Sequence, residues 1–310
     1  MKLVGIPGNA VPAGMVCEEL KSSDGTPLRV AWMTHPDARG TVVIVNGRGD
    51  YIERYFETIR DLQARNFAVA IFDFRGQGAS ARPLRNRYRS LLKNFSAYDK
   101  DLKSVMTQCV LKRLPGPYLA LGHSTGAHVL LRVLRKESWF LRVVLSAPLL
   151  GVHTGGWPML VVRGLTSSFT LLGLGAVFLP GHLKRPLSNL GFEGNAFTSD
   201  PQRFQRDAAI LAAEPQLGVG GPSFSWLRAA LKSMDELARL GRSTKLTAPV
   251  LIIAAGADRI VDTKAAFNFA ARVPGVSFIT IEGARHELLC ERTEIREQFL
   301  AAFDAFVDGP

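Results

Sequence analysis

The sequence predicts an α/β fold with a mostly parallel central sheet, flanked by helices and carrying one helical insertion. Three observations support this prediction. Short runs recur that are apolar almost throughout, as in strands buried on both faces of a parallel sheet. Helical patterns separate these runs, which is typical of a doubly wound sheet. The alternation stops between residues 148 and 247 and then resumes.

The expected elements follow one another as this fold class requires. The first strand comes after the turn signal Ser23-Asp24-Gly25. The predicted strands are 28–33, 41–46, 67–72, 117–122, 142–147, 249–255 and 276–281. The predicted helices are 50–65, 95–113, 125–136, 263–272 and 291–307.

The insertion contains no convincing strand and is predicted to be a helical cap. Between residues 151 and 183 the only charged side chain is Arg163. A membrane-spanning helix needs about 20 apolar residues, and polar residues interrupt this run, so an apolar cap helix is favoured. The predicted organisation is core 1–147, cap 148–247 and core 248–310. A separate second domain is the alternative, but it would leave the strands after residue 249 without a sheet.

The composition indicates one large core with a basic surface. Of 310 residues, 47% are hydrophobic, and 38 basic against 27 acidic side chains give a net charge of +11. Such a charge attracts anionic surfaces, whether phospholipid headgroups or nucleic acids. No nucleic-acid recognition motif is present, so no nucleic-acid partner is expected.

Cysteine usage and the N-terminal residues favour a cytoplasmic location. Three scattered cysteines, Cys17, Cys109 and Cys290, favour a reducing environment. Residues 1–14 lack the apolar core of a signal peptide. We expect a cytoplasmic protein that makes peripheral contact with the anionic inner face of the membrane. The sequence carries no signal of oligomeric state.

The strongest motif is Gly122-His123-Ser124-Thr125-Gly126, a G-x-S-x-G pattern between a predicted strand and a predicted helix. A sharp strand-to-helix turn there would expose the serine hydroxyl, and the flanking glycines would avoid clashes with the neighbouring turn. The following helix N-terminus favours developing negative charge. Ser124 is therefore predicted to be a catalytic nucleophile.

A serine nucleophile needs a histidine base and a carboxylate that orients it. In this arrangement the acid and then the histidine follow the serine, each after a later strand. Asp258 and His286 follow the last two predicted strands, so both are expected at the same sheet edge as Ser124. Asp262 is the alternative acid. The segment from His286 to Cys290, HELLC, has cysteine where a zinc motif has its second histidine, so no metal is expected.

The loop NGRG at 46–49 follows a predicted strand and has two interpretations. As a dinucleotide-binding loop it has a carboxylate, Asp73, near the expected place, but Ile52 replaces the third glycine, so no cofactor is expected. As an oxyanion hole it would offer the backbone N–H of Arg48, together with that of Thr125. The order of the serine, acid and histidine favours the oxyanion hole.

Six segments carry a family resemblance: NGRGDYIERY (46–55), DFRGQGAS (73–80), GHSTGA (122–127), SAPLLG (146–151), AGADRIVD (255–262) and GARHELLCE (283–291). Together they resemble the bacterial lysophospholipase and monoacylglycerol lipase branch of the α/β-hydrolases. The resemblance implies an α/β-hydrolase fold and cleavage of one acyl ester from a single-chain lipid. It assigns the nucleophile to Ser124, the acid to Asp258 and the base to His286.

The resemblance also has departures. The oxyanion donors would be Arg48 and Thr125, but the family often has Met in place of Thr125 and Gly in place of Ala127. Monoacylglycerol lipases often begin the oxyanion loop with His, where this chain has Asn46. Gly-Arg in that loop favours the lysophospholipase side of the branch.

Two further features point to lipid. The cap residues Trp157, Leu160, Phe169 and Phe178 are predicted to line an acyl-chain site; ordinary packing of cap helices on the sheet is the alternative. The segment 82–93 holds five basic and no acidic side chains. It would suit an anionic lipid surface, and a solvated surface loop is the alternative.

The leading hypothesis is thus a serine hydrolase acting on a lysophospholipid or a monoacylglycerol, with no cofactor. A carboxylesterase for short soluble esters and a serine peptidase remain open, because the cap rather than the catalytic residues sets the substrate. A haloalkane dehalogenase would need a carboxylate at position 124. A catalytically idle ligand-binding protein is the alternative from another class, but it would not need Ser124, Asp258 and His286 together.

Overall fold

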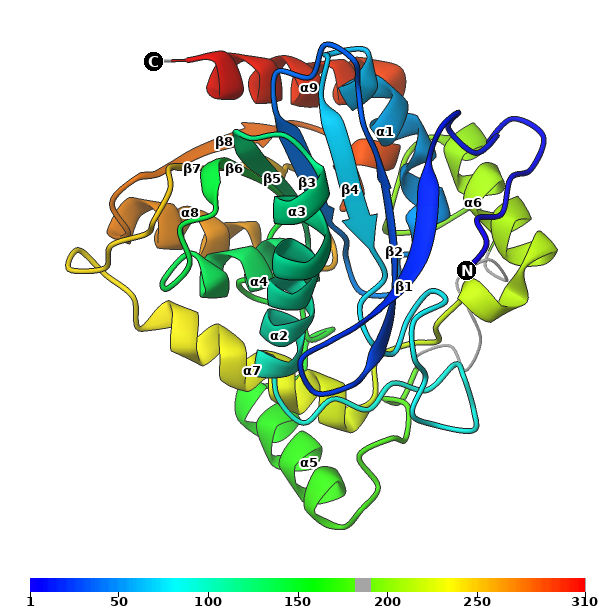
Figure 1. The fold of residues 1–310 in the computed structure, drawn as a ribbon. Coiled ribbons are helices and arrows are strands. Elements are labelled where there is room, and N and C mark those ends of the chain that lie inside the picture. Colours follow the sequence, from blue (N-terminus) through cyan, green and yellow to red (C-terminus); the bar gives the residue numbers. More distant parts are fainter. Residues whose placement is uncertain (182–190, 310) are drawn as a thin grey trace.

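The computed structural model describes residues 1–181 and 191–309, and its centre is an eight-stranded sheet (Figure 1). The strands are β1 (Val16–Lys21), β2 (Pro27–Met33), β3 (Thr41–Val45), β4 (Ala68–Phe72), β5 (Tyr118–His123), β6 (Phe140–Ser146), β7 (Val250–Ala255) and β8 (Val276–Ile281). Their order in the sheet is β1-β2-β4-β3-β5-β6-β7-β8. Strands β3 to β8 pair in parallel, whereas β1 and β2 pair antiparallel at one edge. The predicted α/β fold with a mostly parallel sheet is confirmed.

β1 is an edge strand that the sequence pattern did not predict. It pairs with β2 from Val16 opposite Trp32 to Lys21 opposite Pro27. Leu20 is its one buried side chain. An edge strand covers the core with few side chains, so it lacks the continuous apolar run that marks the central strands.

The helices are η1 (Ile52–Tyr55), α1 (Phe56–Gln63), α2 (Ser96–Val105), η2 (Met106–Val110), α3 (Leu111–Arg113), α4 (Thr125–Val133), α5 (Met159–Leu171), α6 (Pro201–Ala213), η4 (Pro215–Leu217), α7 (Phe224–Ala238), α8 (Thr263–Arg272), η5 (Leu288–Cys290) and α9 (Thr293–Asp308). Figure 1 shows α1 and α9 together on one side of the sheet, and α2, α4 and α8 on the other. An ion pair between Arg296 and Asp61 at 2.6 Å joins α9 to α1. The sheet is thus covered on both faces, as its apolar strands require.

Helices α5, α6 and α7 lie in sequence between β6 and β7, which are neighbours in the sheet, with Val143 opposite Val250. Trp226 and Leu231 of α7 belong to the same apolar core as the strands. The division at residues 148–247 stays a prediction, and its residues 182–190 lie outside the described part of the chain. Among the described helices, none combines the length and apolarity that a bilayer span requires.

A buried ion cluster holds the start of η1 against the sheet. Arg29 of β2 donates to Asp73 at 2.7 Å and to both oxygens of Glu53 at 2.7 and 2.8 Å. Asp73 also accepts the backbone N–H of Ile52 at 3.0 Å. Asp73, the residue in the place of a ribose-binding carboxylate, is therefore engaged with Arg29 inside the protein. The cluster fixes the exit of the loop that follows β3.

Candidate active site

Ser124 lies at the sharp turn between β5 and α4. Its φ of 49° and ψ of −109° are strained for a residue with a side chain. The flanking glycines are required by space: a Cβ at Gly122 would lie 2.8 Å from Ala127 Cα, and one at Gly126 would lie 1.9 Å from Val45 O. The G-x-S-x-G spacing therefore reflects how tightly this turn packs against α4 and the end of β3.

Ser124, His286 and Asp258 follow β5, β8 and β7 and form one hydrogen-bonded chain. His286 Nδ1 donates to Asp258 Oδ2 at 2.7 Å. In the neutral imidazole with its proton on Nδ1, Nε2 accepts a hydrogen bond from the hydroxyl of Ser124, whose Oγ lies 3.1 Å away. Ser124 and His286 are both buried. The distances are those that a general base and its nucleophile need.

The two candidate acids have different surroundings. Asp258 Oδ1 accepts the backbone N–H groups of Ile260 at 2.8 Å and Val261 at 3.0 Å. Burial raises the pKa of Asp258, but the hydrogen bonds from His286 and these N–H groups outweigh it, so the pKa lies below its ordinary value. Asp262 instead caps the N-terminus of α8. The structure therefore places Asp258, not Asp262, against His286.

The loop after β3 is held in place by side chains that the sequence analysis did not single out. Gln77 donates to the carbonyls of Gly47 at 2.7 Å and Asp50 at 3.2 Å, and its own carbonyl accepts the N–H of Gly49 at 3.2 Å. Within the described residues, neither the N–H of Arg48 nor that of Thr125 has a hydrogen-bond acceptor. Both predicted oxyanion donors are thus left free, while their neighbours are fixed. The only sequence signal for Gln77 was its place in the DFRGQGAS segment.

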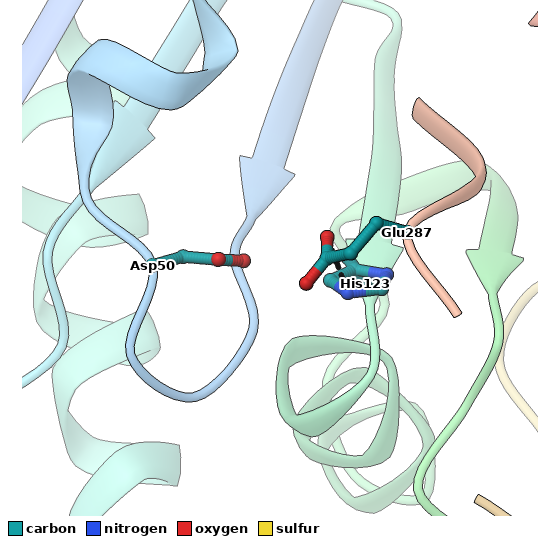
Figure 2. Close-up of side chains that lie close together, drawn as sticks. All are labelled: Asp50, His123 and Glu287. Atoms are coloured by element: carbon teal, nitrogen blue, oxygen red, sulfur yellow. Dashed lines mark ion pairs between the residues drawn. The ribbon is translucent and has the colours of Figure 1, made fainter. Parts of the chain in front are cut away.

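A buried cluster of charged side chains lies beside Ser124 and His286. Figure 2 shows Asp50 facing His123 and Glu287, with the His123 Nε2–Glu287 Oε2 pair, 3.1 Å apart, as a dashed line. Arg54 donates to both carboxylates, and Tyr55 donates to Asp50 at 2.7 Å. The three residues drawn are close enough to hold a metal ion. The carboxylate oxygens of Asp50 and Glu287, however, already accept hydrogen bonds from Arg54, Tyr55 and His123. A metal ion would have to displace these donors.

The pKa values of Glu287 and His123 are shifted in the directions expected for an ion pair between them. Burial raises the pKa of Glu287, but the positive charges of Arg54 and His123 outweigh it and hold the pKa well below its usual range. Burial lowers the pKa of His123, but the Glu287 carboxylate reverses this and raises it. The His123–Glu287 pair was not predicted from the sequence, although His123 directly precedes Ser124 and Glu287 directly follows His286.

The structure separates the four predicted substrate-binding residues. Phe178 is buried, and Phe169 stacks on Phe224 of α7 with ring centroids 4.1 Å apart. Trp157 and Leu160 are 60% and 84% exposed. These two therefore do not line an enclosed tunnel in this conformation, because α5 packs against α7 and leaves its other face to solvent. Binding of an acyl chain by the four residues stays a prediction, and Trp157 and Leu160 are exposed rather than enclosed.

Comparison with known proteins identifies relatives along most of the chain. Lysophospholipase L2 of Escherichia coli K12 is 27% identical over 304 residues, which cover 94% of this chain and 86% of the relative. Monoglyceride lipase of Mus musculus is 24% identical over 282 residues, covering 89% and 84%. The structure of a soluble variant of monoglyceride lipase from Saccharomyces cerevisiae, in complex with a substrate analog, superposes with a TM-score of 0.71 at 18% identity. It covers 94% of this chain and 96% of that one.

The fold and the resemblance drawn from sequence agree with these comparisons. The sequence family described as serine aminopeptidase, S33, matches residues 36–293. This match spans the strands β3 to β8 and every residue of the Ser124–His286–Asp258 chain. The protein therefore belongs to the serine aminopeptidase S33 family and is an α/β-hydrolase similar to lysophospholipases and monoglyceride lipases.

Proposed function

We propose that the protein is a serine hydrolase that cleaves the carboxylic ester of a single-acyl-chain lipid, a lysophospholipid or a monoacylglycerol. The observation that carries the proposal is the hydrogen-bonded chain from Ser124 through His286 to Asp258. The free N–H groups of Arg48 and Thr125 support it as an oxyanion hole. Donors held ready for developing charge contribute strongly to such a reaction.

In the first step Ser124 Oγ attacks the ester carbonyl carbon as its proton passes to His286 Nε2. The carbonyl oxygen becomes an oxyanion that accepts from the N–H groups of Arg48 and Thr125. His286 then protonates the leaving alcohol oxygen as the C–O bond breaks, and the acyl group stays on Ser124. Asp258 keeps the proton on Nδ1 and stabilises the imidazolium.

In the second step water replaces the alcohol. His286 Nε2 takes a proton from the water while the water oxygen attacks the acyl carbon. The second oxyanion collapses, the bond to Ser124 Oγ breaks, and His286 returns the proton to Ser124. The products are an alcohol and a fatty acid, and no cofactor takes part.

The lipid substrate is favoured over a peptide. Two relatives are named for single-chain lipids, whereas the family description names aminopeptidases. An aminopeptidase has to bind a free α-ammonium group. The guanidinium of Arg48, beside the proposed oxyanion hole, has no carboxylate partner among the described residues and would repel that group.

We also propose that α5 rests on an anionic membrane and that residues 148–247 form the cap that carries it. Four side chains at its two ends or next to them are largely exposed: Trp157, Leu160, Leu171 and Leu172. Large exposed apolar patches mark interaction surfaces. The net charge of +11 would draw this apolar face to anionic rather than neutral lipid. The proposed location is the cytoplasmic side, where the inner face of the membrane carries anionic lipid.

Activity measurements on wild type and Ser124→Ala test the proposed function. The panel holds 1-acyl lysophosphatidylcholine, 1-acylglycerol, nitrophenyl esters of short and long chains, and an aminoacyl nitroanilide. We expect release of fatty acid from the lipids, and a loss of about 10⁶-fold in kcat without the nucleophile. Turnover of short esters alone would indicate a general esterase, and turnover of the anilide alone a peptidase. Absence of a fluorophosphonate adduct on Ser124 would favour a ligand-binding protein.

A further inference from the structure

Five arginines near the oxyanion loop have no carboxylate partner among the described residues. They are Arg48, Arg82 and Arg87, which are half-buried, and Arg85 and Arg89, which are exposed. Buried arginines elsewhere are paired with acids: Arg29 with Glu53 and Asp73, Arg54 with Asp50, Asp207 and Glu287, and Arg296 with Glu57 and Asp61. An uncompensated group of cations creates a positive potential that attracts an anionic ligand.

Arg48 extends from the oxyanion loop toward the stretch before α7. Its Nη2 donates to the carbonyls of Gly220 at 2.9 Å and Gly221 at 2.7 Å, and approaches Ser90 Oγ at 3.4 Å. Its Nε is buried without a hydrogen-bond partner. Its guanidinium lies 5.0 Å from the ring centroid of Trp226. Burial without a carboxylate lowers the pKa of Arg48 to about 10, so it remains charged at neutral pH.

Arg82 repeats this pattern. It donates to five backbone carbonyls, those of Gly78, Arg87, Gln216, Leu217 and Gly218. The Nε atoms of Arg82 and Arg87 are both buried without a partner. Burial and the nearby charge of Arg87 lower the pKa of Arg82 to about 10; Asp73 opposes this shift, and Arg48 adds to it. Neutral carbonyls satisfy hydrogen bonds but leave the positive charges in place.

A cleft of about 490 Å³ opens beside these arginines. Leu84, Arg85, Asn86, Arg89 and Ala176 line it, so two cations face its interior and, among the described lining residues, no carboxylate does. The lining residue Arg89 is followed in sequence by Ser90, which contacts Arg48 of the oxyanion loop. Ser90 lies against Arg48 Nη2 and hydrogen-bonds through its carbonyl to Ser223 Oγ at 2.7 Å.

We propose that this cleft binds a phosphate ester, the phosphodiester of a lysophospholipid headgroup, through Arg85 and Arg89. The charges of Arg48 and Arg87 both act on Arg82, and these three arginines would add to the positive potential at the cleft. Guanidinium groups match the geometry of phosphate oxygens. In a lysophospholipid the phosphate is separated from the acyl ester only by the glycerol carbons. The cleft lined by Arg85, Arg89 and Ala176 would then take the headgroup while the ester carbonyl reaches Ser124. The proposal rests on the proposed function and narrows it to phosphate-bearing lipids.

Kinetics on dissolved substrates test the site. The full chain and the double variant R85Q/R89Q are assayed with lysophosphatidylcholine and monoacylglycerol of one short chain length, below the concentrations at which they aggregate. We expect kcat/KM for the lysophospholipid to fall on the order of 10- to 100-fold, through KM. The kcat/KM of R85Q/R89Q for the monoacylglycerol should stay within about twofold of wild type, because that substrate lacks the phosphate. The matched control R242Q/K245Q removes two exposed charges from the stretch between α7 and β7.

A binding experiment separates this proposal from the proposed function. Glycerophosphocholine, which has the headgroup but no ester, is titrated into wild type and R85Q/R89Q by calorimetry. Binding that the double variant loses supports the site even where no ester is hydrolysed. If hydrolysis depends on Ser124 but R85Q/R89Q changes kcat/KM equally for the lysophospholipid and the monoacylglycerol, the proposed function stands and the proposed phosphate site is wrong. Equal losses in R242Q/K245Q would indicate net charge alone. A variant that only binds anionic vesicles less well, with unchanged kinetics, would assign the arginines to a bilayer and also overturn it.

Discussion

His123 Nε2 lies 3.1 Å from Glu287 Oε2, so the residue before Ser124 is paired with the residue after His286. This buried pair joins the turn after β5 to the segment after β8. Arg54 extends it, because it bonds to Glu287 at 3.3 Å and to Asp207 of α6 at 2.8 Å. The nucleophile and the base are thus held together by neighbours that do not take part in the proposed reaction.

Replacing Glu287 by Gln should change how stability depends on pH. The raised pKa of His123 contributes stability that is complete below its unfolded value near 6.5 and is lost as pH rises through the folded value. Glu287→Gln removes the cause of the raised pKa of His123, so the loss of stability with rising pH should disappear. The variant should also have a free energy of unfolding lower by about 3–5 kcal/mol. Denaturant unfolding of both proteins from pH 6 to 9 measures the difference. Parallel profiles would contradict the assignment, and His153→Gln, at an exposed histidine, is the control.

Asp258→Asn should fold normally but lose activity. An amide cannot hold the proton on Nδ1 of His286 in the same way, so kcat should fall about 10⁴-fold. Asp262→Asn is the matched control, because Asn caps a helix as well as Asp does. Steady-state kinetics with thermal unfolding compare the two. A larger loss in the Asp262 variant would transfer the role of the acid to that residue.

Gly126→Ala should disrupt the turn that carries Ser124. The added Cβ would lie 1.9 Å from Val45 O, a backbone atom that cannot move without shifting β3. We expect a loss of about 3 kcal/mol or more of unfolding free energy, together with activity. Gly164→Ala in α5 meets no atom within 4 Å and should be neutral or stabilising by about 0.5–1 kcal/mol. Equal stability of the two variants would refute the packing argument.

Leu171→Glu/Leu172→Glu should weaken binding to vesicles that contain anionic lipid. These side chains are 80% and 74% exposed, and burial of each leucine is worth about 1.5–3 kcal/mol. Co-sedimentation should therefore fall at least about tenfold. Leu111→Glu/Leu141→Glu adds the same charge at exposed leucines of α3 and β6. If that pair weakens binding equally, the effect is one of net charge and α5 is not the contact.

Local patterns were sufficient for the parts of the site whose geometry is local. In the G-x-S-x-G turn, Gly122 is required by contact with Ala127, three residues after Ser124, whereas Gly126 is required by Val45 at the end of β3. The places of Asp258 and His286 follow from parallel strands, whose carboxyl ends meet at one sheet edge. The edge strand β1 was missed, because one-sided burial leaves a weak apolar signal.

The sequence by itself determined the α/β class, the family resemblance and the chain order of the predicted nucleophile, acid and base. Those depend on burial of whole strands and on short-range backbone geometry. Only the tertiary structure decided which charges are paired. It joins His123 to Glu287 across 164 positions and leaves Arg48 facing carbonyls 172 and 173 residues away. It also turns Trp157 and Leu160 to solvent. The physical reason is that charge compensation and exposure depend on neighbours brought together from distant segments, which no local pattern encodes.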